Sequence, residues 1–285
     1  MEAGGNQLQN LVKKLAGVFP GLTRDPNPDR VHKLRTTIRR LEVAMATSGV
    51  PQKPQDKACK LLKKLRRRAG KVRDIDIQYT ALQSVNIRRE EKFKAELLEE
   101  LHEIRQRREK KLIATLKPKF RARLRKRLDN LRAESKVLSL GERVSQALGQ
   151  LQELQQGWTQ RKPSTIEELH AFRLRSKRVR YAFELANGFG AADQYLKVLK
   201  SMQDALGELH DWATLSETVS QRAAPVSPLL AAVRTITAAK HGDARRICAT
   251  GMEQLADLGQ SKAKYPPQSA PKSTLSRAKA AHAVA

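Results

Sequence analysis

Two stretches of the chain carry the same arrangement of histidine, arginine and lysine, H-x-x-R-x-x-x-(R/K)-R. The two copies consist of His32, Arg35, Arg39 and Arg40, and of His170, Arg173, Lys177 and Arg178. Arginine presents a planar fork of N–H donors that fits two oxygens of a phosphate or carboxylate, and lysine supplies a compact positive charge. Residues 169–181 contain no acidic residue that could balance these charges. The pattern therefore predicts a site for an anionic ligand.

Helical spacing places these cations on one face. At about 100° per residue, His32, Arg35 and Arg39 fall within about 60° of one another. Leu34 and Ile38 then point to the opposite side of the same helix. A solvated helix face usually mixes positive and negative side chains, because acids relieve the repulsion between cations. We therefore expect two amphipathic helices, each with an apolar face in a core and a cationic face at a ligand.

Further blocks of the sequence recur at nearly the same spacing. The second histidine pattern begins 138 residues after the first, and three other pairs of blocks lie 137 or 138 residues apart. Those pairs are Lys60 and Lys63 with Lys197 and Lys200, Gly70-x-x-Arg73-Asp74 with Gly207-x-x-His210-Asp211, and Arg107-Arg108 with Arg245-Arg246. Four neighbouring cations extend these sets: Lys64, Arg67, Lys111 and Arg180. A common order and offset in four blocks indicates an internal duplication, so we expect two helical bundles packed side by side.

The composition favours a helical fold with a polyanionic partner. The 285 residues are 40% hydrophobic but only 4% aromatic, a mixture typical of helices packed on helices. The formal net charge of +27 disfavours a compact state through self-repulsion, which an anionic partner would offset. Nucleic acid, anionic lipid surfaces and other polyanions are the classes of partner that such a charge allows.

Helical periodicity runs through the chain, and no segment shows the alternation of a β-strand. The expected helices cover about residues 6–18, 28–47, 55–68, 74–84, 88–116, two further segments up to 156, and then 164–186, 191–206, 209–221 and 228–258. We expect the first helix to stop at Pro20-Gly21 and the third to end near Gly70. Ser164 is the expected N-cap of the 164–186 helix, with Glu167 as its partner three residues on.

This pattern predicts one domain over residues 1–258, with repeats at about 6–135 and 140–258, and a basic, disordered tail rich in Pro, Ser and Ala over 259–285. Cys59 and Cys248 belong to no C-x-x-C or Cys/His cluster, so we expect reduced thiols. We expect no metal ion and no cofactor. Neither a secretory signal nor an apolar run of about 18 residues is present, which predicts a cytoplasmic protein without a membrane partner.

These motifs together resemble the CHAD family, the conserved histidine α-helical domain. The resemblance rests on VHKLRTTIRR, GKVRDIDI, LHAFRLRSKRVRY and LGELHDWATL and covers about residues 6–258. It implies an all-α fold of two pseudo-symmetric four-helix bundles that form one domain with a basic central groove or pore. It also implies a non-catalytic protein that binds inorganic polyphosphate, with polyphosphate granules as a location within the cytoplasm.

The implied ligand residues are the two histidine patterns together with Lys60, Lys63, Lys197 and Lys200. Cations one helical turn apart can neutralise successive phosphates of a polymer that carries about one charge per phosphate. Such a ligand has no nucleobases, so the site needs no groups that recognise them. The second copy departs from the first at Lys177, where the first has arginine, and at His210, where the first has Arg73.

Two other function classes remain open. The net charge and the basic segment 117–127 fit a general polyanion-binding or RNA/DNA-binding protein, but the basic faces lack the aromatic side chains on which bases stack. A metal-dependent phosphohydrolase would need clustered carboxylates. Asp74, Asp76, Asp204 and Asp211 are the available set, and each lies among cations. We therefore expect no enzymatic activity and at most weak binding of nucleic acid.

Overall fold

The computed structural model describes residues 6–46, 52–134, 138–186 and 188–263. Within these ranges the protein is all-α, with nine helices and no strand. The helices are α1 (Asn6–Arg24), α2 (Pro28–Ala46), α3 (Gln52–Ser84), α4 (Glu91–Thr115), α5 (Pro118–Glu134), α6 (Leu140–Gln160), α7 (Ile166–Leu185), α8 (Ala192–Ser220) and α9 (Pro228–Ala263). The expected all-helical class is therefore confirmed.

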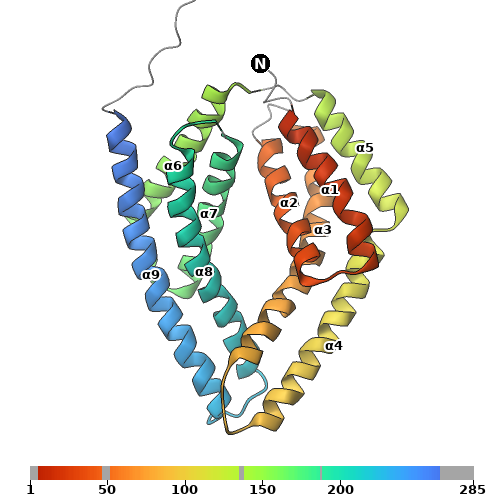
Figure 1. Cartoon of the computed structure of the whole chain (residues 1–285), viewed down its shortest axis with the longest axis vertical. Coiled ribbons are helices and arrows are strands. Elements are labelled where there is room, and N and C mark those ends of the chain that lie inside the picture. Colours follow the sequence, from red (N-terminus) through yellow and green to blue (C-terminus); the bar gives the residue numbers. More distant parts are fainter. Residues whose placement is uncertain (1–5, 47–51, 135–137, 187, 264–285) are drawn as a thin grey trace, which may run out of the picture.

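The helices form two arms that converge at one end of the molecule (Figure 1). One arm holds α1–α5 and the other α6–α9. The first arm has its own core, which includes Leu34 and Ile38 of α2. The second arm has a separate core, which includes Phe172 of α7 and Leu199 of α8. Leu34 and Ile38 are the residues that the sequence placed on the apolar face of the first basic helix.

A third core joins the arms where they converge. It contains apolar residues of α3, α4, α8 and α9, among them Leu82, Leu101 and Leu215. Polar contacts reinforce it, because Thr218 Oγ1 donates to Gln78 Oε1 over 2.7 Å. Contacts between helices far apart in sequence therefore hold the arms together at this end.

Two predicted breaks between helices, at Gly70 and around Gly207, lie inside continuous helices. The expected helices at 55–68 and 74–84 are the single helix α3, and those at 191–206 and 209–221 are the single helix α8. Glycine within a helix costs about 1 kcal/mol relative to alanine. The neighbours Ala69 and Leu206 are buried in the cores, so packing outweighs that cost and the helices continue through Gly70 and Gly207.

Two other helices also run further than expected. α1 continues through Pro20 to Arg24, because Phe19 and Leu22 are buried in the core and Thr23 Oγ1 donates to the Phe19 carbonyl over 3.0 Å. α9 reaches Ala263, five residues beyond the expected boundary at 258. The remainder of the predicted tail, residues 264–285, lies outside the described residues.

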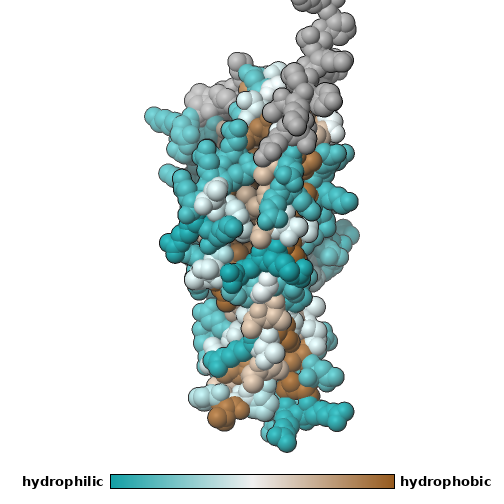
Figure 2. Space-filling view, turned by 90° about the vertical axis from the view of Figure 1, so that its left-hand side faces the viewer, coloured by the Kyte–Doolittle hydropathy of each residue, from teal (hydrophilic) through white to brown (hydrophobic). Residues whose placement is uncertain are grey.

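Cys59 and Cys248 are free thiols, one packed against each of the two arm cores. The face that α9 presents is largely hydrophilic, with small hydrophobic patches (Figure 2). Across the described ranges, none of the helices combines the length and hydropathy needed to cross a membrane.

Candidate anion-binding site

The two basic helices, α2 and α7, lie in different arms and are linked by an ion-pair cluster. Arg40 Nε donates to Glu184 Oε2 over 2.6 Å, and Arg180 Nη1 lies 3.2 Å from the other oxygen of the same carboxylate. Glu184 thus pairs with one cation of each basic helix. It fixes the two histidine patterns side by side although they are far apart in sequence.

The start of α7 is set by a capping box one residue later than expected. Thr165, rather than Ser164, is the N-cap, and its side chain accepts from the backbone N–H of Glu168. The Glu168 side chain in turn accepts from the backbone N–H groups of Thr165 and Ser164. These hydrogen bonds lower the pKa of Glu168 to about 2, so the cap is ionised at all physiological pH values.

A cavity of about 670 Å³ lies between α2, α3, α7 and α8. Its lining carries many more cations than anions. The basic lining residues are His32, Arg35, Arg39, Arg40, Arg73, Arg173, Lys177, Arg180 and Lys200. The acidic lining residues are Asp204, Glu208 and Asp211. The structure therefore brings nine of the predicted site residues, drawn from both arms, to one cavity.

In the first arm the central arginine is held by a carboxylate. Arg35 Nη1 lies 3.2 Å from Asp74 Oδ1 and donates to the Gly70 carbonyl over 3.4 Å. The guanidinium packs on α3, where a Cβ at Gly70 would be 4.0 Å from Arg35 Cζ, an ordinary contact distance. Gly70 and Asp74 of the predicted block therefore position Arg35.

In the second arm the equivalent arginine is less well paired. Arg173 lies against Gly207, where a Cβ would be 3.6 Å from Arg173 Nη2. Its Nε is buried and donates no hydrogen bond to any described residue. Burial lowers the pKa of Arg173, and the charge of Asp211 opposes that shift. The Arg173 guanidinium thus retains a donor for a ligand.

Lys177 lies among arginines within the cavity. Burial lowers its pKa to about 6, and the charges of Arg173, Arg39 and Arg35 add to this effect. It makes no ion pair with any described residue. An anionic ligand would favour the ammonium form, because an opposite charge nearby raises the pKa of an amine.

The histidines and Asp211 feel the same crowding of positive charge. The rings of His170 and His210 are 4.5 Å apart between centroids. Burial, together with Arg173, lowers the pKa of His210 to about 4, and burial also lowers the pKa values of His170 and His32. Burial raises the pKa of Asp211 to about 6, against the charges of Arg173 and Arg73. In the free site the histidines therefore hold a proton less readily, and Asp211 more readily, than solvated side chains would.

The remaining predicted site residues do not line this cavity. They are Lys60, Lys63, Lys64, Arg67, Arg107, Arg108, Lys111, His170, Arg178, Lys197, His210, Arg245 and Arg246. His170 and His210 still interact with Lys177 through charge. Lys64 Nζ instead lies 6.0 Å from the Phe120 ring of α5. Arg108 donates to the Lys71 carbonyl.

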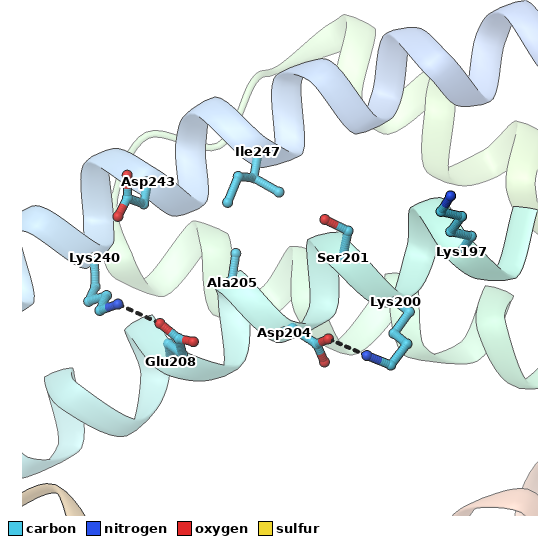
Figure 3. Close-up of a pocket in the computed structure, with 9 residues that line it drawn as sticks. All are labelled: Lys197, Lys200, Ser201, Asp204, Ala205, Glu208, Lys240, Asp243 and Ile247. Atoms are coloured by element: carbon cyan, nitrogen blue, oxygen red, sulfur yellow. Dashed lines mark hydrogen bonds and ion pairs between the residues drawn. The ribbon is translucent and has the colours of Figure 1, made fainter.

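A second pocket, of about 440 Å³, lies between α8 and α9 (Figure 3). Lys197 lines this pocket, whereas Lys200 lines both it and the central cavity. Lys240 Nζ lies 2.6 Å from Glu208 and Lys200 Nζ lies 2.8 Å from Asp204. Most of its cations are already paired with carboxylates, unlike those of the central cavity.

Sequence reasoning missed several residues of the site. Glu184 and Asp211 were not included, and neither were the lining residues Thr36, Gln203 and Tyr181. Asp211 could have been found from its place in the second Gly-x-x-His-Asp block. Glu184 follows Arg180 by one helical turn, but its contact with Arg40 depends on how the arms pack.

Three of the four carboxylates considered for a metal-dependent reaction are each paired with a cation. Asp76 is paired with Arg105 at 2.6 Å, Asp74 with Arg35 and Asp204 with Lys200. In the described part of the chain, no group of three His, Cys, Asp or Glu side chains is placed to hold a metal ion.

Comparisons with known proteins agree with this architecture. The crystal structure of the CHAD domain from the plant Ricinus communis aligns with a TM-score of 0.69 at 20% identity, covering 88% of this chain and 91% of that chain. PptA from Streptomyces chartreusis aligns with a TM-score of 0.62 at 16% identity, covering 90% of this chain and 97% of that chain. At these identities the likeness shows a shared fold. A search of curated proteins gives no significant match.

The family model for the CHAD domain matches residues 6–220, from the first residue of α1 to the last residue of α8. This region includes both histidine patterns and every residue that lines the central cavity. Since the match covers most of the sequence, the chain belongs to the CHAD family.

Proposed function

We propose that the protein binds inorganic polyphosphate without catalysing a reaction on it. The observation that carries this proposal is the excess of cations in the central cavity, to which both arms contribute. Arg39, Lys177 and Arg173 lie there without a carboxylate at ion-pair distance among the described residues. A ligand with closely spaced negative charges would relieve their mutual repulsion.

A linear phosphate chain fits the chemistry of this lining. Each guanidinium can donate two parallel hydrogen bonds to phosphate oxygens, and each ammonium neutralises one charge. Apart from the imidazole of His32, the only aromatic side chain among the described lining residues is Tyr181, whose ring already faces the Arg180 guanidinium at 4.8 Å. Base stacking therefore contributes little, which favours a polyanion without bases over RNA or DNA.

We also infer that the two arms are pseudo-symmetric repeats of one domain. Support comes from Arg35 against Gly70 and Asp74 on one side and Arg173 against Gly207 and Asp211 on the other. In this view α4 and α5 together correspond to α9, with Pro118 at the break between them. Each arm then contributes four helical segments, and the cavity lies between the repeats.

A competition experiment tests the proposed ligand. Labelled long-chain polyphosphate is bound to the full chain at physiological salt and then challenged with tripolyphosphate and with RNA of equal total charge. We expect tripolyphosphate to compete weakly and RNA to fail at equal charge. Ready displacement by RNA would instead make the cavity part of a general polyanion surface, with the exposed cations of α5 as a second contact region.

Catalysis is tested on the same preparation. Polyphosphate is incubated with the protein and with Mg²⁺ or Mn²⁺, and its length and the released phosphate are followed. We expect neither to change. Phosphate release that rises with protein concentration would show that the bound chain is a substrate. If binding holds in cells, a fluorescent fusion should gather at polyphosphate granules.

A further inference from the structure

We propose that Lys177 is a site of acylation by small acyl phosphates that enter the central cavity as anions. Loss of the Lys177 charge would then weaken the binding of a polyanion in the same cavity. The second part of this inference rests on the proposed function, whereas the first depends only on the cavity and its charges.

The position of Lys177 makes its amine unlike that of a surface lysine. It lies half-buried on α7, facing Arg35 and Arg39 of α2 and Arg173 of its own helix. No described carboxylate lies at ion-pair distance from it. Crowding by like charges and partial removal from water both disfavour the ammonium form. The neutral amine, which is the nucleophilic form, is therefore favoured.

The other charged groups around Lys177 leave the neutral amine favoured. Arg180 adds positive charge from α7, and His210 of α8 and His32 of α2 also face Lys177. Asp211 of α8 is a carboxylate whose charge interacts with Lys177, but burial raises its own pKa to about 6. The pKa of Lys177, about 6, means that most of the amine is neutral at pH 7.5. An ordinary lysine is neutral in roughly one molecule in a thousand at that pH.

The cavity also attracts the second reactant. An acyl phosphate carries a phosphate dianion next to an activated carbonyl, and the arginines around Lys177 can hold that dianion. The Lys177 nitrogen attacks the carbonyl carbon, an amide N–C bond forms, and the C–O bond to phosphate breaks. The amine proton moves to the departing phosphate, so the products are an amide and hydrogen phosphate. The same cations stabilise that leaving group.

Lys200 provides a matched control within the same cavity. It also lines the central cavity, but its side chain is 69% exposed and its Nζ lies 2.8 Å from Asp204 (Figure 3). A carboxylate partner and solvation both favour the unreactive ammonium form. Lys197, one turn earlier on α8, lines only the pocket between α8 and α9. A faster reaction at Lys177 than at Lys200 would therefore be due to the charges around Lys177, because both lysines are accessible from the same cavity.

The experiment treats the full chain with acetyl phosphate and quantifies acetylation of each lysine by mass spectrometry from pH 6 to pH 8.5. We expect Lys177 to react at least about tenfold faster than Lys200 at pH 7. Because a bound anion itself favours the ammonium form, the rate is followed at acetyl phosphate concentrations far below saturation, where its pH dependence reports the free protein. There the rate at Lys177 should change little above pH 7 and fall below pH 6, whereas the rate at an ordinary lysine rises about tenfold per pH unit. Tripolyphosphate should slow the reaction at Lys177 and leave that at Lys197 unchanged.

Two outcomes would overturn the acylation site: equal rates at Lys177 and Lys200, or a Lys177 rate that climbs tenfold per pH unit through pH 8.5. Either result is independent of polyphosphate binding, which is measured separately. Binding is compared before and after acetylation in the wild type and in Lys177→Arg. We expect at least about a tenfold loss in the wild type and little change in Lys177→Arg, because one lost ion contact in a cavity weakens binding by about that factor. Equal losses in both proteins would assign the effect to other lysines.

Discussion

The two arms use the same three residue types differently. Arg35, Gly70 and Asp74 form a connected group in which the arginine and the carboxylate are 3.2 Å apart and the Asp74 side chain is 47% exposed. Arg173, Gly207 and Asp211 occupy the corresponding places. The Arg173 Nε, however, is buried without a hydrogen-bond partner among the described residues, and burial raises the pKa of Asp211 to about 6. The central arginine of the first arm is thus paired in the free protein, whereas that of the second arm makes no ion pair with a described carboxylate.

This difference separates the residues that maintain the site from those that respond to a ligand. A paired and partly solvated arginine contributes to folding before any ligand arrives. An arginine or lysine held among like charges lowers the stability of the free protein. An anion that binds there removes the repulsion, so the lost free energy contributes to binding. Binding sites often carry such local instability. The comparison therefore predicts that equivalent substitutions in the two arms have unequal effects on stability.

The largest effect is expected from charge reversal at the centre of the cavity. Arg39→Glu combined with Lys177→Glu should weaken polyphosphate binding more than about a hundredfold, because two cations become anions beside the bound phosphates. The control, Lys60→Glu combined with Arg67→Glu, changes the net charge equally on an exposed face of α3 outside the cavity. We expect this control variant to lose less than about tenfold in polyphosphate affinity at physiological salt. Similar losses in both double variants would refute the cavity as the binding site.

Single substitutions should distinguish the two arms. Arg35→Ala and Arg173→Ala should each cost about 1–3 kcal/mol of binding free energy. Arg35→Ala should also lower the free energy of unfolding by about 1 kcal/mol, because Asp74 loses its partner. Arg173→Ala should leave the free energy of unfolding unchanged or raise it, because a poorly paired buried charge is removed. Urea denaturation and binding titrations measure both quantities, and equal destabilisation in the two variants would contradict the comparison.

Polyphosphate binding should strengthen as the pH falls from 8 to 6. Lys177 has a pKa of about 6 in the free protein, and a bound anion raises it, so binding takes up a proton in this range. Affinity at constant ionic strength should rise by up to about tenfold per pH unit. Lys177→Arg should reduce this dependence, leaving the smaller contribution of the histidines. Calorimetry in buffers of different ionisation enthalpy counts the protons; no uptake by the wild type would contradict the prediction.

The stability of the free protein should change with pH in the opposite direction. Between pH 6 and pH 8 the unfolded chain holds a proton on Lys177 that the folded protein largely lacks, since the folded pKa is about 6 and the unfolded value about 10.4. Stability therefore rises with pH in this window. Thermal unfolding at pH 6 and pH 8 should show a larger increase in the wild type than in Lys177→Met. An equal increase would place the titrating group elsewhere.

The smallest effects are expected from the two helix glycines. A Cβ would meet the arginine side chains at ordinary contact distances, 4.0 Å at Gly70 and 3.6 Å at Gly207. Gly70→Ala and Gly207→Ala should therefore each stabilise the protein by about 0.5–1 kcal/mol through helix propensity. Gly207→Ala should weaken binding slightly more than Gly70→Ala, because its methyl group lies nearer to the arginine. Thermal melts and binding titrations of both variants sharpen the comparison of the arms.

The sequence predicted the helical class, the apolar faces of α2 and α7, and the cations that meet between them. Periodicity and charge are local properties, and both could be counted along the chain. The pairing of Glu184 with Arg40, which lie 144 positions apart, depends on the crossing of helices from different arms. For the same reason the sequence could not show that the basic row of Lys60, Lys63 and Arg67 lies outside the lining of the central cavity.

The continuity of α3 and α8 could not be judged from glycines alone. A glycine weakens a helix by a fixed amount wherever it occurs, but the packing of Ala69 and Leu206 on either arm supplies a larger opposing term. Such packing becomes visible only in three dimensions.

The shared core where the arms converge has a consequence for synthesis on the ribosome. Ile75, Leu82 and Leu101 of the first arm are covered by residues of α8 and α9, the last of which is Val233. About one hundred residues separate Glu134, the end of α5, from Val233. At roughly 5–20 residues per second, an apolar surface of the newly made first arm waits about 5–20 s for its cover. During that interval the nascent chain presents a site for a general chaperone, and a chain released early would carry the same exposed surface into aggregates.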